Sequence, residues 1–148
     1  MIKKTIKYHD YDGNEREDDF HFHLNQVEMT KLDGEVPGGL QNHLKEIGKN
    51  EDRLGLLKVI DLIISRAYGR RLPDGAFIKR APNGLPLYEE FVNTEAYDNL
   101  LTDLLQNQEN VMNFLTGCMT KDAQDKIRSE WEKMKAEEAN SVTLTPIK

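Results

Sequence analysis

The sequence predicts an α+β fold that is mainly α, with an N-terminal β-hairpin packed on a helical domain, a central apolar helix and a charged C-terminal helix. Three observations predict this class. Two runs before residue 25 alternate between apolar and polar residues, residues 51–68 are apolar around most of a helix, and charge dominates after residue 120. With 148 residues, 38% of them hydrophobic, the chain fits one domain, or one domain with an appendage.

The hairpin is predicted from the alternating residues 2–9 and 19–24 and from the turn composition of residues 10–14. A register with Ile6 opposite Phe20 places nearly all the apolar side chains on one face, and Tyr8 then lies opposite Asp18. The same register predicts a loop of residues 12–14. Because a lone hairpin is marginal in water, the rest of the protein must cover its apolar face.

Apolar residues at steps of three and four predict a series of helices. They cover residues 26–32, 39–48, 51–68, 86–93, 94–105, 109–116 and 121–138. Asn25 is expected to cap the first, Asn50 the central one, and Gly69 to follow the central helix as its left-handed C′ residue. Proline and glycine predict an irregular segment over residues 70–86, with Phe77 and Ile78 against the core.

The last predicted helix carries one narrow stripe of large or apolar residues in a charged surround. The stripe consists of Ala123, Ile127, Trp131 and Met134. Two interpretations are open: the helix docks on its own domain, or it binds a partner. Residues 139–148 have no periodicity and are expected to fray.

No pattern in the sequence predicts an enzyme, a metal site or a cofactor site. His21 and His23 lie on one strand face, as zinc ligands can, but the predicted register brings no third ligand beside them. Cys118 is the single cysteine, which excludes an intramolecular disulfide. The glycine-rich segments lack the Gly-Lys-Ser/Thr of a phosphate loop. We therefore expect no catalytic residue, no metal and no cofactor.

The charge balance favours a protein partner over nucleic acid. A net charge of −6 and a pI near 5.3 oppose unspecific binding to nucleic acid. A local basic patch opposes this trend. It consists of Arg66, Arg70, Arg71, Lys79 and Arg80. The N-terminus does not resemble a signal peptide, no apolar stretch is long enough to span a membrane, and the lone cysteine suits a reducing cytoplasm.

An ordered set of short segments carries a family resemblance. The segments are Asp10–Phe20 with its flanking strands, Phe22–Asn25, Gly38–Leu40, Ala67–Gly69, Pro73–Gly75, Phe77–Lys79, and Phe91 with Thr94–Tyr97. In this order they resemble the tail assembly chaperones of long-tailed, siphovirus-type phages and prophages of Gram-positive bacteria. The resemblance covers residues 1–117, a hairpin-plus-helical chaperone domain, and leaves residues 118–148 as a C-terminal amphipathic helix and flexible tail.

The resemblance implies a non-enzymatic function in tail morphogenesis. Such proteins bind the long, helical tape measure protein, keep it soluble and help recruit tail tube subunits. It further implies self-association, a location in the host cytoplasm and absence from the finished virion. No catalytic or ligand residues are carried over from the family.

Two sets of side chains are the expected partner contacts. The first is the stripe of Ile127, Trp131 and Met134, and the second is Tyr8, Phe20 and Phe22, provided that the hairpin face is not fully covered. The alternative function is that of a small phage regulatory or nucleic-acid-associated protein acting through the basic loop 66–80.

Overall fold

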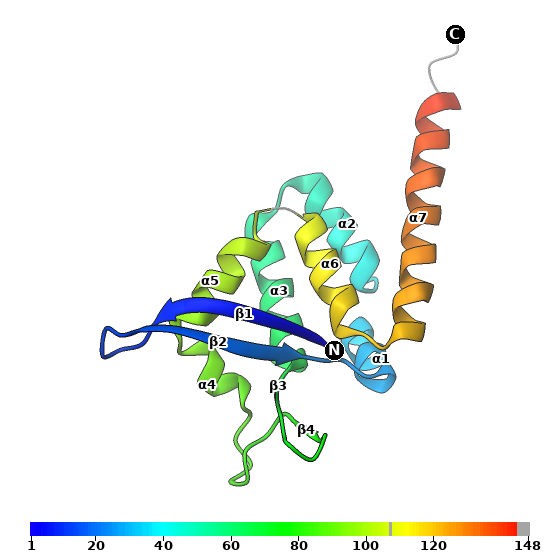
Figure 1. Cartoon of the computed structure of the whole chain (residues 1–148). Coiled ribbons are helices and arrows are strands. Elements are labelled where there is room, and N and C mark those ends of the chain that lie inside the picture. Colours follow the sequence, from blue (N-terminus) through cyan, green and yellow to red (C-terminus); the bar gives the residue numbers. More distant parts are fainter. Residues whose placement is uncertain (107, 145–148) are drawn as a thin grey trace.

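The structure, a computed structural model, describes residues 1–106 and 108–144. Within that range, the side chains of residues 108, 127, 130, 131, 134, 135 and 138–144 lie outside the description. The structure confirms the predicted class, because a small antiparallel sheet at the N-terminus is followed by a mainly helical body (Figure 1).

The strands form one sheet in the order β1-β2-β3-β4. They are β1 (Ile2–His9), β2 (Glu15–Phe22), β3 (Tyr68–Arg71) and β4 (Phe77–Ile78). The helices are α1 (Gln26–Glu35), α2 (Leu40–Asn50), α3 (Arg53–Ala67), α4 (Tyr88–Val92), α5 (Glu95–Leu104), α6 (Gln108–Cys118) and α7 (Lys121–Leu144). The hairpin lies across one side of the helices, and α7 extends away from the body (Figure 1).

The hairpin register differs from the predicted one by two residues. Ile2 lies opposite Phe22 and Ile6 lies opposite Asp18. The difference arises in the turn, where the carboxylate of Asp10 accepts hydrogen bonds from the backbone N–H groups of Asp12 (3.0 Å) and Asn14 (2.9 Å). This Asx-type turn closes a loop of residues 10–14, longer than predicted. Because the shift is an even number of residues, every side chain keeps its predicted face.

The central helix is confirmed as the middle of the core. It contacts α1, α2, α5 and α6. Its buried residues are Leu56, Val59, Ile60, Ile63, Ile64 and Ala67. The predicted start was wrong: Asp52, not Asn50, caps the helix by accepting from the N–H of Gly55 (2.9 Å). Asn50 is the last residue of α2, which therefore ends two residues later than predicted, and the left-handed Glu51 (φ 52°) follows as its C-cap.

The hairpin rests mainly on α5 and α6, which contact β1, with α3 in the layer behind (Figure 1). Aromatic rings join the sheet to the helices. Phe22 is fully buried, and its ring centre lies 5.7 Å from that of Phe91 in α4 and 5.1 Å from that of Phe114 in α6. Tyr68 stacks on Phe91 at 4.6 Å. Such contacts contribute more than buried area alone, so they fix the sheet on the helices.

The sequence analysis missed β3 and β4. Residues 68–71 extend the sheet, because His21 pairs with Gly69 and Phe22 with Tyr68. Gly69 is therefore a buried strand residue, and the prediction of a left-handed helix terminus there was wrong. A Cβ at this position would lie 2.5 Å from the carbonyl oxygen of Ile78. Glycine is required here because the β3–β4 backbone passes too close for any side chain.

Both ends of the helical region extend further than predicted. α1 continues to Glu35, with Asn25 and Glu28 forming the capping box at its start. α7 continues to Leu144, beyond the predicted end at residue 138. That residues 139–148 fray stays a prediction, and residues 145–148 lie outside the described part. Cys118 and Met119 are buried, so the core reaches past the predicted division at residue 117. The division into two domains stays a prediction.

The close approach at Gly69 leads to a stability prediction. Gly69→Ala should destabilise the fold by about 1–3 kcal/mol, because the backbone of β4 must move to admit the methyl group. The measurement is the denaturant midpoint of unfolding. Gly34→Ala in α1 is the matched control: it has open space around it and should stabilise by about 0.5–1 kcal/mol. Equal effects of the two substitutions would contradict the assignment.

Candidate functional site

The histidines of the hairpin do not come together as a metal site. His21 lies opposite Lys3 on the exposed face of the sheet. In the described part of the chain, no three histidine, cysteine or carboxylate side chains are placed so that they could hold a metal ion. Burial raises the pKa of the Cys118 thiol to about 12, which makes this cysteine a poor nucleophile at neutral pH.

Carboxylates of the same chain pair with part of the basic patch. Arg66 pairs with Glu35 and Arg70 pairs with Glu90, each at 3.0 Å. Arg80 donates to the carbonyl of Gly84 (3.0 Å). These contacts engage the guanidinium groups of Arg66, Arg70 and Arg80, and they weaken the case for nucleic-acid binding through residues 66–80.

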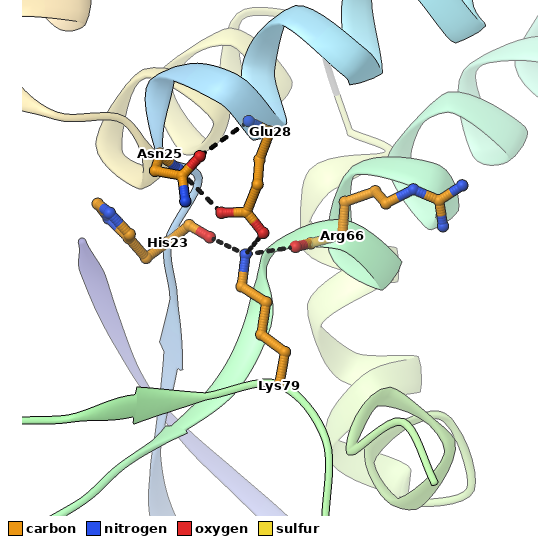
Figure 2. Close-up of polar contacts among 5 residues, drawn as sticks. All are labelled: His23, Asn25, Glu28, Arg66 and Lys79. Carbon is orange, nitrogen blue, oxygen red and sulfur yellow. Dashed lines mark hydrogen bonds and ion pairs between the residues drawn. The ribbon is translucent and has the colours of Figure 1, made fainter. Parts of the chain in front are cut away.

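Lys79 is the most heavily engaged cation of this loop (Figure 2). Its ammonium group donates to the carbonyl oxygens of His23 and Arg66, both at 2.7 Å, and to the carboxylate of Glu28 at 2.6 Å. The Lys79 and Glu28 side chains are only 26% and 30% exposed. This cluster, called the Lys79 node below, joins the end of β2, the last turn of α3 and the first turn of α1.

A second polar cluster lies on the other side of α3. The carboxylate of Asp61 accepts hydrogen bonds from the hydroxyls of Tyr88 and Tyr97. Burial and then the hydrogen bond to Asp61 raise the pKa of Tyr97 to about 12, and the same causes raise the pKa of Tyr88. Both phenols therefore stay protonated as donors and fasten α4 and α5 to α3.

The hairpin residues proposed as contacts are largely covered. Phe22 has no exposed surface, so it belongs to the core and can meet a partner only if the fold opens. Tyr8 and Phe20 are half-buried and pack on each other with ring centres 5.9 Å apart. The hydroxyl of Tyr8 donates to Asp18. Only the outer edges of Tyr8 and Phe20 are open to a partner.

The C-terminal helix offers a more open surface. Ala123 packs on the core, but every described α7 side chain from residue 125 to residue 137 is exposed. The side chains of Ile127, Trp131 and Met134 lie outside the described part. Their positions follow Ala123 at helical spacing, so they continue the face that begins against the core.

An open groove of about 600 Å³ runs between α1 and the first turns of α7. Met29 and Thr30 of α1 form one wall, and Ala123 and Lys126 of α7 form the other. The sequence analysis did not find this groove, because α1 and α7 are almost one hundred residues apart and no local pattern links them.

Comparison with known families identifies the family of this chain. The profile of the phage tail assembly chaperone family matches residues 1–146. The chain belongs to this family. The match corrects the earlier boundary of the resemblance, because it extends over α7 and does not stop at residue 117. Comparison with curated proteins and with solved structures finds no match.

Family membership indicates the kind of partner that this chaperone has. The family is a non-catalytic kind of protein whose role in tail assembly implies protein partners. None of the described helices combines the length and the hydropathy needed to cross a bilayer. The groove and α7 are therefore the candidate surface for a protein partner.

Removing the Lys79 ammonium should cost more stability than removing an exposed cation nearby. Lys79→Met should destabilise the chaperone by about 2–3 kcal/mol, because Glu28 and two carbonyls lose their partner at a half-buried site. Arg66→Met removes only an exposed ion pair and should cost less than about 1 kcal/mol. Denaturant unfolding measures both, and similar losses would contradict the role of the node.

The tyrosines should make the chaperone sensitive to alkaline pH. The pKa values of Tyr8, Tyr68, Tyr88 and Tyr97 are raised in the fold from the ordinary 10.0. The unfolded chain releases these protons near pH 10, whereas the fold retains them, so their stabilisation is complete below pH 10 and is lost as pH rises toward 12. Unfolding at a series of pH values measures this. Tyr97→Phe should flatten the decline, and phenolate absorbance rising at the same pH in folded and unfolded chains would contradict it.

Proposed function

We propose that this chaperone binds the tape measure protein of its phage, keeps it soluble and helps recruit tail tube subunits during tail morphogenesis. The observation that carries the proposal is the family match over residues 1–146. In this proposal the chaperone works in the host cytoplasm, self-associates and is absent from the finished virion.

The surface of α7 supports a client-binding role for the C-terminal helix. A client helix can lie along an apolar stripe when the stripe is free and flanked by charge. Ala123 begins such a stripe at the groove, and the positions of Ile127, Trp131 and Met134 continue it. Met29 across the groove widens the apolar surface. We assign the main client contact to this stripe, with the outer edges of Tyr8 and Phe20 as secondary contacts.

Shielding explains how such contact would keep the client soluble. A long helical protein exposes apolar stripes before the tail tube surrounds it, and exposed apolar patches drive aggregation. Covering one stripe with another removes that surface from water, and the charged residues of α7 keep the complex in solution. The cover must be reversible, because tube subunits replace it later.

Co-expression tests the function. A tape measure fragment from the same phage should be more soluble with the chaperone than without it. If the fragment stays equally insoluble in both cases, the proposed function fails.

Variants of α7 then test the contact. Trp131→Ala should weaken fragment binding about tenfold or more, because tryptophans at the centre of an interface are frequent hot spots. Glu132→Ala, at an exposed neighbouring position, is the matched control and should bind as the wild type does. Equal binding by both variants would remove the stripe from the client contact while leaving the function open.

A further inference from the structure

His23 is a half-buried histidine directly after β2, and its surroundings suit only an uncharged ring. Its Nδ1 atom is buried and has no hydrogen-bond partner among the residues that the structure describes. The ring bonds instead to the backbone of Cys118, so we place its single proton on Nε2. A second proton, on Nδ1, would be a buried donor without an acceptor, which costs free energy.

The charges around the ring also oppose a second proton. Lys79 binds the carbonyl of His23 itself at 2.7 Å, and the amino group of Met1 adds a second positive charge nearby. The neighbouring carboxylate, that of Glu28, is already engaged at both oxygens: Oε1 accepts from the N–H of Asn25 (3.0 Å) and Oε2 accepts from Lys79 (2.6 Å). The ring also points away from this carboxylate (Figure 2). Glu28 is therefore not free to pair with a charged ring.

These surroundings set the direction in which the ring responds to pH. Burial, then the Met1 amino group and Lys79, lower the pKa of His23 below its ordinary value of 6.5. Glu28 and the backbone of Cys118 oppose this change and do not cancel it. Because the pKa is lower in the fold than in an opened chain, the stabilisation is complete above pH 6.5. It is lost as the pH falls from 6.5 to the pKa of the folded ring.

The ring lies where two distant chain segments meet the end of β2. The N–H of His23 donates to the carbonyl of Ala67 at the end of α3 (2.9 Å). The N–H of Leu24 donates to the carbonyl of Cys118 at the end of α6 (2.8 Å). The ring itself meets Phe77 at right angles, with ring centres 6.3 Å apart. A charged ring in this place reaches water only by leaving Cys118 and Phe77.

We propose that His23 is an acid-sensitive latch, a side chain whose protonation opens the junction between the end of β2 and the start of α7. At neutral pH the uncharged ring stays between Phe77 and Cys118. When Nδ1 takes a proton from water, the charged ring has no acceptor and no free carboxylate there, so it moves out to solvent. The hydrogen bond between Leu24 and Cys118 then opens more readily. The inference goes beyond the proposed function, because no step involves a client.

NMR hydrogen exchange of the full chain at a series of pH values tests the latch, and the imidazole signal of His23 gives the pKa of the folded ring. After correction for intrinsic exchange, protection of the Leu24 N–H should fall about tenfold for each pH unit between 6.5 and that pKa. Below pH 6.5 Leu24 should also exchange faster than Ile60 in the middle of α3, which reports global unfolding. Constant protection of Leu24 would overturn the proposal. Equal protection of Leu24 and Ile60 would mean that the junction opens only with the whole fold, and would overturn it too.

A glutamine substitution separates the charge of the ring from its hydrogen bond. Glutamine is uncharged at every pH and can still donate to the backbone of Cys118, so His23→Gln should lose the pH dependence of Leu24 protection. His21→Gln is the matched control on the same strand, where His21 pairs with Gly69, and it should respond as the wild type does. A His23→Gln protein that keeps the wild-type response would overturn the proposal. If this variant does not fold, the comparison of Leu24 with Ile60 in the wild type decides the question.

Discussion

The fold depends on one ammonium group that three elements share. Lys79 binds the carbonyl of His23 where β2 ends, the carbonyl of Arg66 in the last turn of α3 and the carboxylate of Glu28 at the start of α1. A cation suits the end of α3, where carbonyls without helical partners carry partial negative charge. Burial lowers the pKa of His23, so its imidazole stays neutral beside the lysine. The sheet, α3 and α1 thereby hold one relative position.

This position decides where the candidate partner surface lies. The N–H of Leu24, next to His23, donates to the carbonyl of Cys118 (2.8 Å), and Leu24 also forms a parallel bridge with Met119. α7 begins directly after this point, so the end of β2 sets the start of α7. Glu28 belongs to the same cluster and fixes the start of α1. The Lys79 node therefore helps to position both walls of the groove.

Local patterns predicted what depends on neighbouring residues. The hairpin faces, the N-cap at Asn25 and the central helix follow from spacing and cap chemistry within a few residues. The exact register did not follow, because the carboxylate of Asp10 closes the loop and a shift of two residues leaves the apolar face unchanged. β3 was missed because glycine after Tyr68 equally suits a helix end, and its pairing partner lies almost fifty residues earlier. Lys79 resembled one charge of a basic patch, since its three partners are distant in sequence.

The distribution of charge explains why the basic patch is not the candidate partner surface. Arg66, Arg70 and Lys79 pair with Glu35, Glu90 and Glu28, so these three cations of the basic patch bind other parts of the fold. The stripe of Ala123, Ile127, Trp131 and Met134 in α7 has charged residues on both sides. α7 extends away from the body (Figure 1), so the helix that carries the proposed client contact lies where a partner can reach it.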